Sequence, residues 1–260
     1  MDKPKSEDQR PQAGLRGAIL RFGRRLRPLV NKVIARYSQV GDPAIFAPGT
    51  FPWTGELERN WPRIRAEAET VLRYREVLPP LGELSPDHKR IAVGENWKTF
   101  FLWAYKYRFS ATCARCPETA RIVEAIPGLI TATFSIMAPH AHVPRHKGVT
   151  KGMVTCHLAL ITPQEREKCR IEIGDTAHVW REGEALVFDD TVKHEVWNDT
   201  DEERVVLLLH VARPIRFPGS LVAGFFLWAV RHSPFIQDAR VNMALWLKQL
   251  EQASEAPEAG

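Results

Sequence analysis

The sequence predicts an α+β protein, mainly β, with a sandwich or jelly-roll core behind a layer of helices. Helical periodicity dominates the chain up to Gly128, and short strand-like runs follow one another after it. Gly, Pro, Asn and Asp interrupt these runs roughly every 10 to 15 residues, with no helical pattern between them. Helices first and strands afterwards favour antiparallel sheets covered by helices over alternating βαβ units.

The composition is that of a soluble globular protein. The chain has 260 residues, 44% of them hydrophobic and 26% charged, which fits one good-sized domain with appendages. Four cysteines at irregular spacing indicate reduced thiols in a cytoplasmic compartment, not a secreted disulfide framework. The N-terminus lacks the apolar segment of a signal peptide. The longest apolar run, Leu221 to Val230, falls short of the about 20 residues that span a bilayer.

A basic amphipathic helix is predicted near the N-terminus. From Leu15 to Tyr37 apolar residues recur at helical spacing, arginines fill the other faces, and no acid occurs between Gln9 and Gly41. Such asymmetry suggests an anionic partner, either membrane lipid or nucleic acid, and a basic amphipathic helix is typical of peripheral binding to the inner face of a membrane. We therefore expect no nucleic-acid partner. The alternative is that the apolar stripe packs on the domain and the arginines are solvated.

The remaining segments divide the chain into three parts. Residues 1–45 form a disordered tail plus the basic helix, 46–218 the jelly-roll domain, and 219–260 an apolar segment and a helix. A helix over Trp53–Val77 and a shorter one over Pro117–Ile126 form the helical layer. The aromatic run Asn96–Trp103 is expected to be a strand whose large side chains lie in the core. Further strands are expected at Ile130–Met137, Met153–Ile161, Cys169–Ile173, Ala185–Phe188 and Arg204–Val211, a loop at Ser85–Glu95, a last helix at Ala239–Leu250, and disorder over Ala253–Gly260.

The Cys113–Cys116 pair is expected to be incidental. A structural zinc site would need a second pair, and Cys156 and Cys169 are isolated. A redox role would need a βαβ unit, which the pattern does not predict.

Two histidines and one arginine stand out as candidate site residues. His146 and His194 both lie where a strand-like run meets a loop, and Arg204 lies at the mouth of the next apolar run. Two histidines on neighbouring strands and an arginine deeper in the sheet can hold an iron and an anionic cosubstrate. The alternative is that each histidine is a hydrogen-bonded structural residue.

Several motifs, in order, resemble the aspartyl/asparaginyl β-hydroxylase family. They are Phe134-Ser135-Ile136-Met137, His142-Val143-Pro144, His146-Lys147-Gly148, His157-Leu158-Ala159-Leu160 and the run from Phe188 to Trp197. The resemblance spans Trp97 to Pro214. It implies a double-stranded β-helix fold and a dioxygenase that uses iron(II), 2-oxoglutarate and O2, with His146 and His194 binding the metal. It further implies that Arg204 and Ser135 bind the distal carboxylate of 2-oxoglutarate, that His157 lies near its chelating end, and that Trp97 borders the pocket.

The sequence departs from related patterns at two positions. Gly148 occupies the position at which many related oxygenases carry a metal-binding carboxylate, although members of this family commonly have glycine there. Asp189, Asp190 and Glu195 are the alternatives for a third protein ligand, and an outer-shell role is expected for them. Thr155 replaces an arginine of peptide-acting members, so the resemblance leaves open how a carboxylate there is held.

The resemblance favours hydroxylation of an unactivated C–H, with a membrane-lipid acyl chain as the leading substrate. Lipid-hydroxylating relatives occur in the family, and the basic helix and the apolar Leu221–Val230 suit work at a membrane. The alternatives are β-hydroxylation of aspartyl or asparaginyl groups in a peptide or small molecule, and a non-catalytic jelly roll that only binds.

Overall fold

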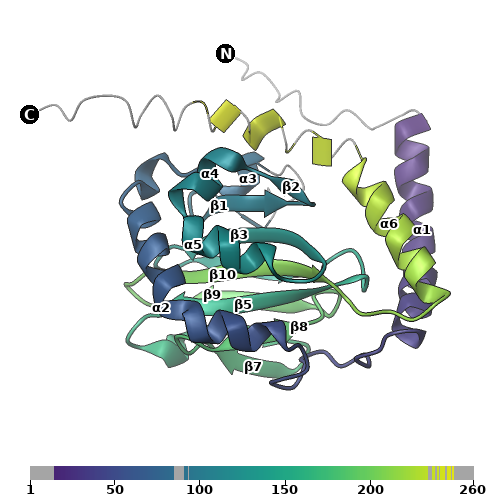
Figure 1. Ribbon diagram of the computed structural model, residues 1–260, viewed down its shortest axis with the longest axis horizontal. Coiled ribbons are helices and arrows are strands. Elements are labelled where there is room, and N and C mark those ends of the chain that lie inside the picture. Colours follow the sequence, from purple (N-terminus) through teal and green to yellow (C-terminus); the bar gives the residue numbers. More distant parts are fainter. Residues whose placement is uncertain are drawn as a thin grey trace, which may run out of the picture.

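Two antiparallel β-sheets packed face to face form the core of the computed structural model (Figure 1). It describes residues 15–84, 91–92, 94–233, 236–237, 239, 241–243, 245–246 and 248, those at 15–24 by backbone only. The large sheet has the strand order β2-β1-β3-β10-β5-β8 and the small sheet β4-β9-β6-β7. The strands are β1 (Trp97–Ala104), β2 (Tyr107–Arg108), β3 (Leu129–Met137), β4 (His142–His146), β5 (Met153–Ile161), β6 (Cys169–Ile173), β7 (Thr176–Val179), β8 (Ala185–Phe188), β9 (His194–Asn198) and β10 (Arg204–Ala212).

The chain crosses between the sheets at almost every step from β3 onward. β3, β5, β8 and β10 belong to the large sheet, whereas β4, β6, β7 and β9 belong to the small one. This alternation is the winding of a jelly roll, or double-stranded β-helix. It confirms the predicted fold class.

Side-chain alternation along the large sheet creates two separate cores. Phe134, Leu158 and Leu207 point outward into a core shared with the helices. Their near neighbours Met137, Ala159 and Val206 point inward, into a core shared with the small sheet. Any polar residue in register with the inward set therefore faces the interior of the sandwich.

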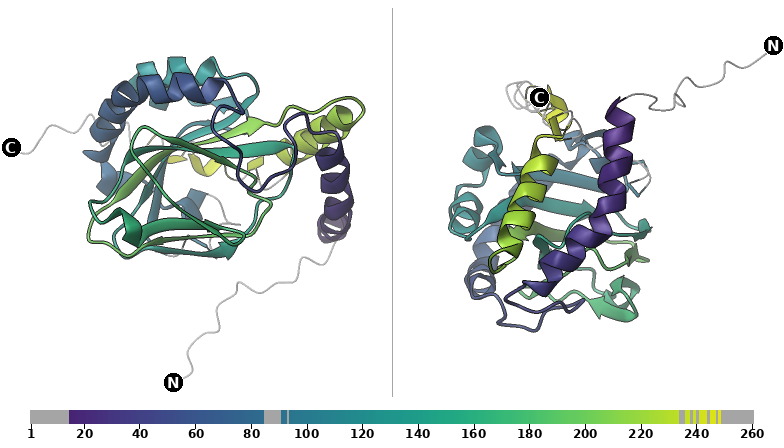
Figure 2. Two further views of the ribbon diagram at one scale, coloured as in Figure 1. Left: turned by 90° about the horizontal axis from the view of Figure 1, so that it is seen from below. Right: turned by 90° about the vertical axis from the view of Figure 1, so that its right-hand side faces the viewer.

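Helices α2 (Trp53–Leu72) and α5 (Pro117–Glu124) cover the outer face of the large sheet (Figure 2, left). The face of α2 predicted to be apolar is buried through Leu57, Ile64, Ala68 and Val71. The short helices α3 (Leu81–Leu84) and α4 (Ser110–Arg115) and the 3-10 turns η1 (Arg75–Val77) and η3 (Arg166–Lys168) complete the connections.

The N-terminal helix lies apart from this layer. α1 (Leu15–Arg36) packs beside α6 (Gly219–Arg231) at one end of the sandwich (Figure 2, right). A bridge between Ser38 and Ile215 joins the end of one helix to the start of the other. Gly219 is required there, because a Cβ would lie 2.5 Å from the Cβ of Tyr37. The sequence predicted α1 correctly but not this pairing with α6.

Most predicted strands are confirmed, and the missed ones are short. β2, β4, β7 and β9 have only two to five residues and carry polar side chains, so they lack a clear apolar alternation. Of the predicted helix at Ala239–Leu250, the described residues are helical. The predicted disordered ends, 1–13 and 253–260, and most of the predicted loop at 85–95 lie outside the described residues.

Two glycine substitutions should change stability in opposite directions. Gly183 has a φ of +82°, and a Cβ there would lie 2.8 Å from the Trp61 indole nitrogen. Gly183→Ala should therefore lower the free energy of unfolding by about 1–3 kcal/mol. Gly224, on the exposed face of α6, has no atom within 4 Å of a built Cβ. Gly224→Ala should raise stability by about 0.5–1 kcal/mol. Urea unfolding measures both changes, and equal changes in the free energy of unfolding would contradict these predictions.

Candidate functional site

His146 and His194 meet across the two neighbouring strands of the small sheet. His146 ends β4, His194 begins β9, and the two residues are register partners. Their ring centroids lie 4.2 Å apart. Nδ1 of His146 is 2.8 Å from the Pro144 carbonyl, and Nδ1 of His194 is 2.9 Å from the Val192 carbonyl. Because a carbonyl only accepts, each Nδ1 carries the proton and each Nε2 keeps its lone pair.

Both imidazoles are neutral at physiological pH. Burial lowers the pKa of His146. Burial, and then the charge of His146, lowers the pKa of His194 to about 4. Neutral imidazole is the form that binds a metal ion, so the pair can act as two ligands without first losing a proton.

Arg204 is buried in the same interior without a carboxylate beside it. It begins β10 and lies in one row with Met137 and Trp97 across three strands. Its guanidinium stacks 4.5 Å above the Trp180 ring, and Nη2 donates to the Met137 sulfur at 3.2 Å. Burial lowers the pKa of Arg204, and neither Nε nor Nη1 has a hydrogen-bond partner among the described residues.

Such an arginine is suited to an acidic ligand. Buried polar groups in proteins are almost always satisfied, and a guanidinium presents paired donors that match a carboxylate. The unpartnered Nε and Nη1 thus fit the carboxylate of a bound 2-oxoglutarate.

Ser135, Trp97 and His157 lie on the same inner face of the large sheet. The indole Nε1 of Trp97 donates to Ser135 Oγ at 2.9 Å, which leaves the hydroxyl proton of Ser135 available to another acceptor. His157 packs edge-on against Phe188, with 5.2 Å between centroids. Burial, and then the charges of Arg204 and His194, lowers its pKa well below the ordinary value. The structure therefore brings all six predicted site residues into one interior.

Asp190 fills the space that a side chain at position 148 would need. A Cβ built on Gly148 would lie 2.1 Å from the Asp190 carboxyl carbon, and Gly148 N donates to the Asp190 carbonyl at 2.7 Å. Burial, and then the charge of Asp189, raises the pKa of Asp190 to about 7. In the described part of the chain, no three or more His, Cys, Asp or Glu side chains form a group that could hold a metal. Asp190 thus borders the histidine pair without joining it.

The other two candidate carboxylates, Glu195 and Asp189, interact with partners other than the histidine pair. Glu195 points to the opposite face of the small sheet, where its Oε1 lies 2.8 Å from Nε2 of His142. Asp189 Oδ2 accepts from Lys151 Nζ at 2.7 Å and from Arg213 Nη2 at 2.6 Å. Asp42 Oδ1 accepts from the same two cations, at 2.6 and 3.0 Å. This network of Asp42, Lys151, Asp189 and Arg213 has a fully buried pair, Asp189 and Arg213, at its centre, and it ties the segment after His146 to the turn before His194.

Sequence reasoning found neither this network nor the packing around Arg204. Asp42 lies in a Gly- and Pro-rich linker, and Arg213 follows a strand, so neither has a local pattern that marks a partner. Trp180 and Met137, which hold the guanidinium, are indistinguishable in sequence from ordinary core residues.

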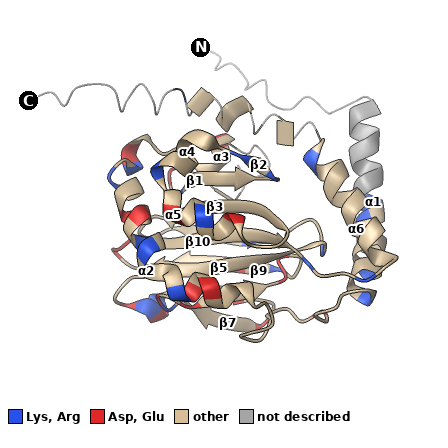
Figure 3. Ribbon diagram, in the orientation of Figure 1, with Lys and Arg blue, Asp and Glu red and all other residues tan. Residues whose placement is uncertain are grey.

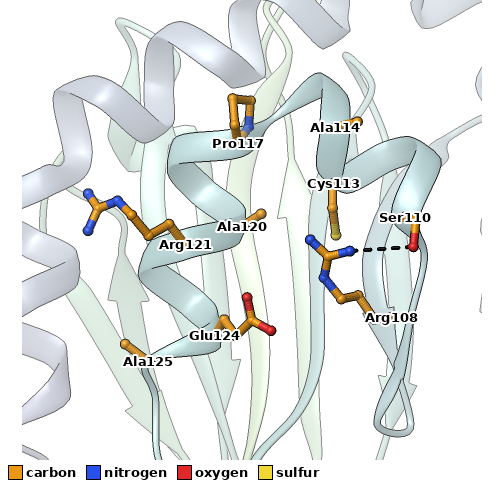
Figure 4. Close-up of a pocket in the computed structure, with 9 residues that line it drawn as sticks. All are labelled: Arg108, Ser110, Cys113, Ala114, Pro117, Ala120, Arg121, Glu124 and Ala125. Atoms are coloured by element: carbon orange, nitrogen blue, oxygen red, sulfur yellow. Dashed lines mark hydrogen bonds between the residues drawn. The ribbon is translucent and has the colours of Figure 1, made fainter.

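One surface hollow is separate from the histidine pair. It measures about 580 Å³ and is lined by residues of α4, α5 and β2, including Arg108, Cys113 and Glu124 (Figure 4). These helices lie on the outer side of the large sheet, whereas the histidines face its inner side. Burial raises the pKa of Cys113 to about 11, and it also raises that of Cys116. Protonated, buried thiols are poor nucleophiles and poor metal ligands.

Removing the Asp189 charge should destabilise the protein in a pH-dependent way. Burial raises the pKa of Asp189, but hydrogen bonds from Lys151 and Thr191 and the charge of Arg213 outweigh it, and the net shift is downward from 3.8. The stabilisation is therefore complete above the unfolded-state pKa and is lost as the pH falls through the folded-state value. Asp189→Asn should cost about 3–5 kcal/mol at pH 7.

Denaturant unfolding at pH 7 and at decreasing pH measures this effect. The difference between the wild type and Asp189→Asn should shrink in acid. Asp175→Asn, at an exposed turn, is the matched control and should match the wild type at both pH values. A difference that is small at pH 7, or constant with pH, would contradict the role of the network.

Comparison with known proteins shows the family to which the chain belongs. The family model "Aspartyl/Asparaginyl beta-hydroxylase" matches residues 58–214. The ornithine lipid ester-linked acyl 2-hydroxylase of Rhizobium tropici is 37% identical over 243 residues, 92% of this chain and 85% of that protein. The human aspartyl/asparaginyl beta-hydroxylase is 32% identical over 61% of this chain but only 21% of its own length. A cupin domain of an XRE-family regulator from Enterobacter cloacae has a TM-score of 0.32 at 12% identity, over 45% of this chain and 96% of that chain. The chain belongs to the aspartyl/asparaginyl β-hydroxylase family and is a hydroxylase of that iron- and 2-oxoglutarate-dependent type.

Proposed function

We propose that this enzyme hydroxylates an acyl chain of an ornithine-containing membrane lipid. The observation that carries the substrate class is the extent of the match to the Rhizobium tropici enzyme. It leaves out about 8% of this chain, so it necessarily includes α6 and most of α1. The match to the human enzyme covers only 61%, which is close to the share that the family model matches at residues 58–214.

The site residues are proposed to divide the binding of cofactor and cosubstrate. Nε2 of His146 and of His194 would hold iron(II). Arg204 would bind the distal carboxylate of 2-oxoglutarate, helped by the Ser135 hydroxyl, with His157 near the chelating end. When bound with O2, these groups supply the oxidising power: one oxygen atom enters the C–H bond, and 2-oxoglutarate becomes succinate and CO2.

The protein's own contribution is positioning and the exclusion of water. The carbonyls of Pro144 and Val192 fix the imidazole tautomers. Trp97 orients the Ser135 hydroxyl, and Trp180 holds the guanidinium plane of Arg204. Asp190 would not bind the metal or the cosubstrate itself. It would act by hydrogen bonding to the groups around the metal.

A lipid substrate places the enzyme at a membrane surface, and we propose a peripheral contact on the cytoplasmic side through the basic helix at 15–37. Within the described residues, no helix combines the length and the apolar character that crossing a bilayer requires. Hydroxylation of aspartyl or asparaginyl groups in a peptide is the second candidate, since the human relative bears that name. Thr155 disfavours it, because its hydroxyl cannot pair with a carboxylate as an arginine does.

Mass spectrometry tests the reaction directly. Anaerobic reconstitution with iron(II) and 2-oxoglutarate, then exposure to air in the presence of ornithine lipid, should add one oxygen atom to an acyl chain and release succinate. His194→Ala should abolish both while leaving the fold intact, because a ligand at a strand end adds little to the core. Hydroxylation of an aspartyl peptide instead of the lipid would contradict the substrate, and turnover by His194→Ala would contradict the metal site.

Replacing Arg204 should separate cosubstrate binding from metal binding. Arg204→Lys keeps the charge but loses the paired hydrogen bonds, which typically contribute about 1.5–3 kcal/mol. The KM for 2-oxoglutarate should therefore rise by roughly tenfold or more, while iron binding measured by equilibrium dialysis stays near the wild-type value. Arg170→Lys, on the outer face of the small sheet, is the control. An unchanged KM in Arg204→Lys would make this arginine structural.

A further inference from the structure

We infer that α6 and the outer face of α1 together form a docking surface for an anionic lipid bilayer, with apolar side chains of α6 entering the interface. The biological purpose of this surface rests on the proposed lipid substrate, but the evidence for it is independent of the chemistry. It comes from exposure, charge and the position of the two helices.

α6 exposes a stripe of large apolar side chains. Leu221, Phe225 and Trp228 follow one another at helical spacing and are 64%, 69% and 56% exposed. Phe217, just before the helix, is 75% exposed. The opposite face of α6 is packed on the domain, where Ala223 is buried. Large apolar side chains gathered on one helix face, in contact with water, indicate an interaction surface.

α1 adds positive charge beside this stripe. Arg25, Leu29, Lys32 and Arg36 lie on one helical face and are exposed. The face turned to the domain carries Ile34, which is fully buried. The helices lie side by side in front of the sheets, so their outer faces point away from the sandwich together (Figure 2, right).

The net positive charge of α1 and α6 indicates which partner binds this surface. The sequence has no Asp or Glu between residues 10 and 41, or between 204 and 237. The described parts of the α1 and α6 ribbons accordingly carry the colour of basic residues but not that of acidic ones (Figure 3). Two copies of such a surface would repel each other. A bilayer with anionic headgroups matches both the basic side chains and the apolar stripe. Its phosphates attract the basic side chains, and its acyl region accepts the apolar ones.

The docking surface is continuous with the candidate site. On α1, Arg27 donates to the carbonyls of Gly148 and Val149, and Asn31 Oδ1 accepts from Lys151 N at 3.0 Å. On α6, Ala223 and Leu227 approach to 3.6 Å from the position of a Cβ on Gly152. Both helices therefore contact the segment that follows His146. A bilayer bound to them presents its acyl chains next to the histidine pair.

Vesicle flotation with the metal-free chain of 260 residues tests the apolar stripe. The wild type should bind vesicles made of equal parts phosphatidylcholine and phosphatidylglycerol. Phe225→Gln/Trp228→Gln should lower the partition coefficient by roughly tenfold or more. The control, Tyr74→Gln/Val77→Gln, changes side chains that are 45% and 44% exposed beside η1, remote from α6, and should bind as the wild type does. Circular dichroism melting should show all three folded alike.

A charge-reversal pair tests the basic flank. Arg25→Glu/Lys32→Glu should weaken binding to the anionic vesicles by roughly tenfold or more, since each basic residue near the surface contributes appreciably. It should leave the weak binding to pure phosphatidylcholine vesicles unchanged. The same reversal at Arg59 on α2 and at Arg73 just after that helix, Arg59→Glu/Arg73→Glu, should have little effect.

Two results would overturn the proposal. One is binding of both test variants to anionic vesicles as tightly as the wild type. The other is a wild-type dimer that Phe225→Gln/Trp228→Gln converts to a monomer without loss of vesicle binding, which would make the stripe a contact between copies. Flotation needs neither iron nor cosubstrate. Succinate release with detergent-dispersed lipid therefore reports on the proposed reaction separately, and either result can fail without the other.

Discussion

The buried charge network around Asp189 is the constraint on which the candidate site depends. Asp189 and Arg213 have fully buried side chains, so each needs the other to remain charged in the interior. Lys151 and Asp42 extend the pair to the segment after His146 and to the linker between α1 and α2. Four distant parts of the chain are thus tied together next to the histidine pair. The position of His146 relative to His194 depends on this network as well as on the strand register.

Arg204 is also a buried charge, but its surroundings differ from those of Asp189. Asp189 is matched by cations within the fold, whereas the Arg204 guanidinium is held by an aromatic ring and a sulfur that cannot neutralise it. An arginine in this state has a lowered pKa and unused donors. A carboxylate ligand would relieve both, and the attraction between the two charges would be stronger than in water because Arg204 is buried. The proposed binding of an acidic cosubstrate rests on these unused donors.

The helix pair α2 and α5 and the helix pair α1 and α6 differ in what they pack against. The helices α2 and α5 seal the outer side of the large sheet and pack on an apolar core to which the strands contribute the larger share. α1 and α6 contribute little to that core, and they lie at the end of the sandwich beside the segment after His146. Their large exposed side chains are costly in water, so their retention suggests a function outside the stability of the domain. The proposed membrane surface, next to an interior site, would let the enzyme act on a lipid that stays in its bilayer.

The sequence alone determined the strands and helices that have a strong local pattern. β3, β5 and β10 are long apolar runs, and α2 repeats its apolar residues at helical spacing, so nearest neighbours suffice to identify them. The motif order identified His146, His194 and Arg204 as positions of interest. Only the tertiary structure decided that the two histidines are register partners, that Asp190 occupies the space beside Gly148, and that α1 pairs with α6. Each of these depends on contacts between residues far apart in the chain, and the short polar strands β4 and β9 are defined by their partners and not by their own side chains.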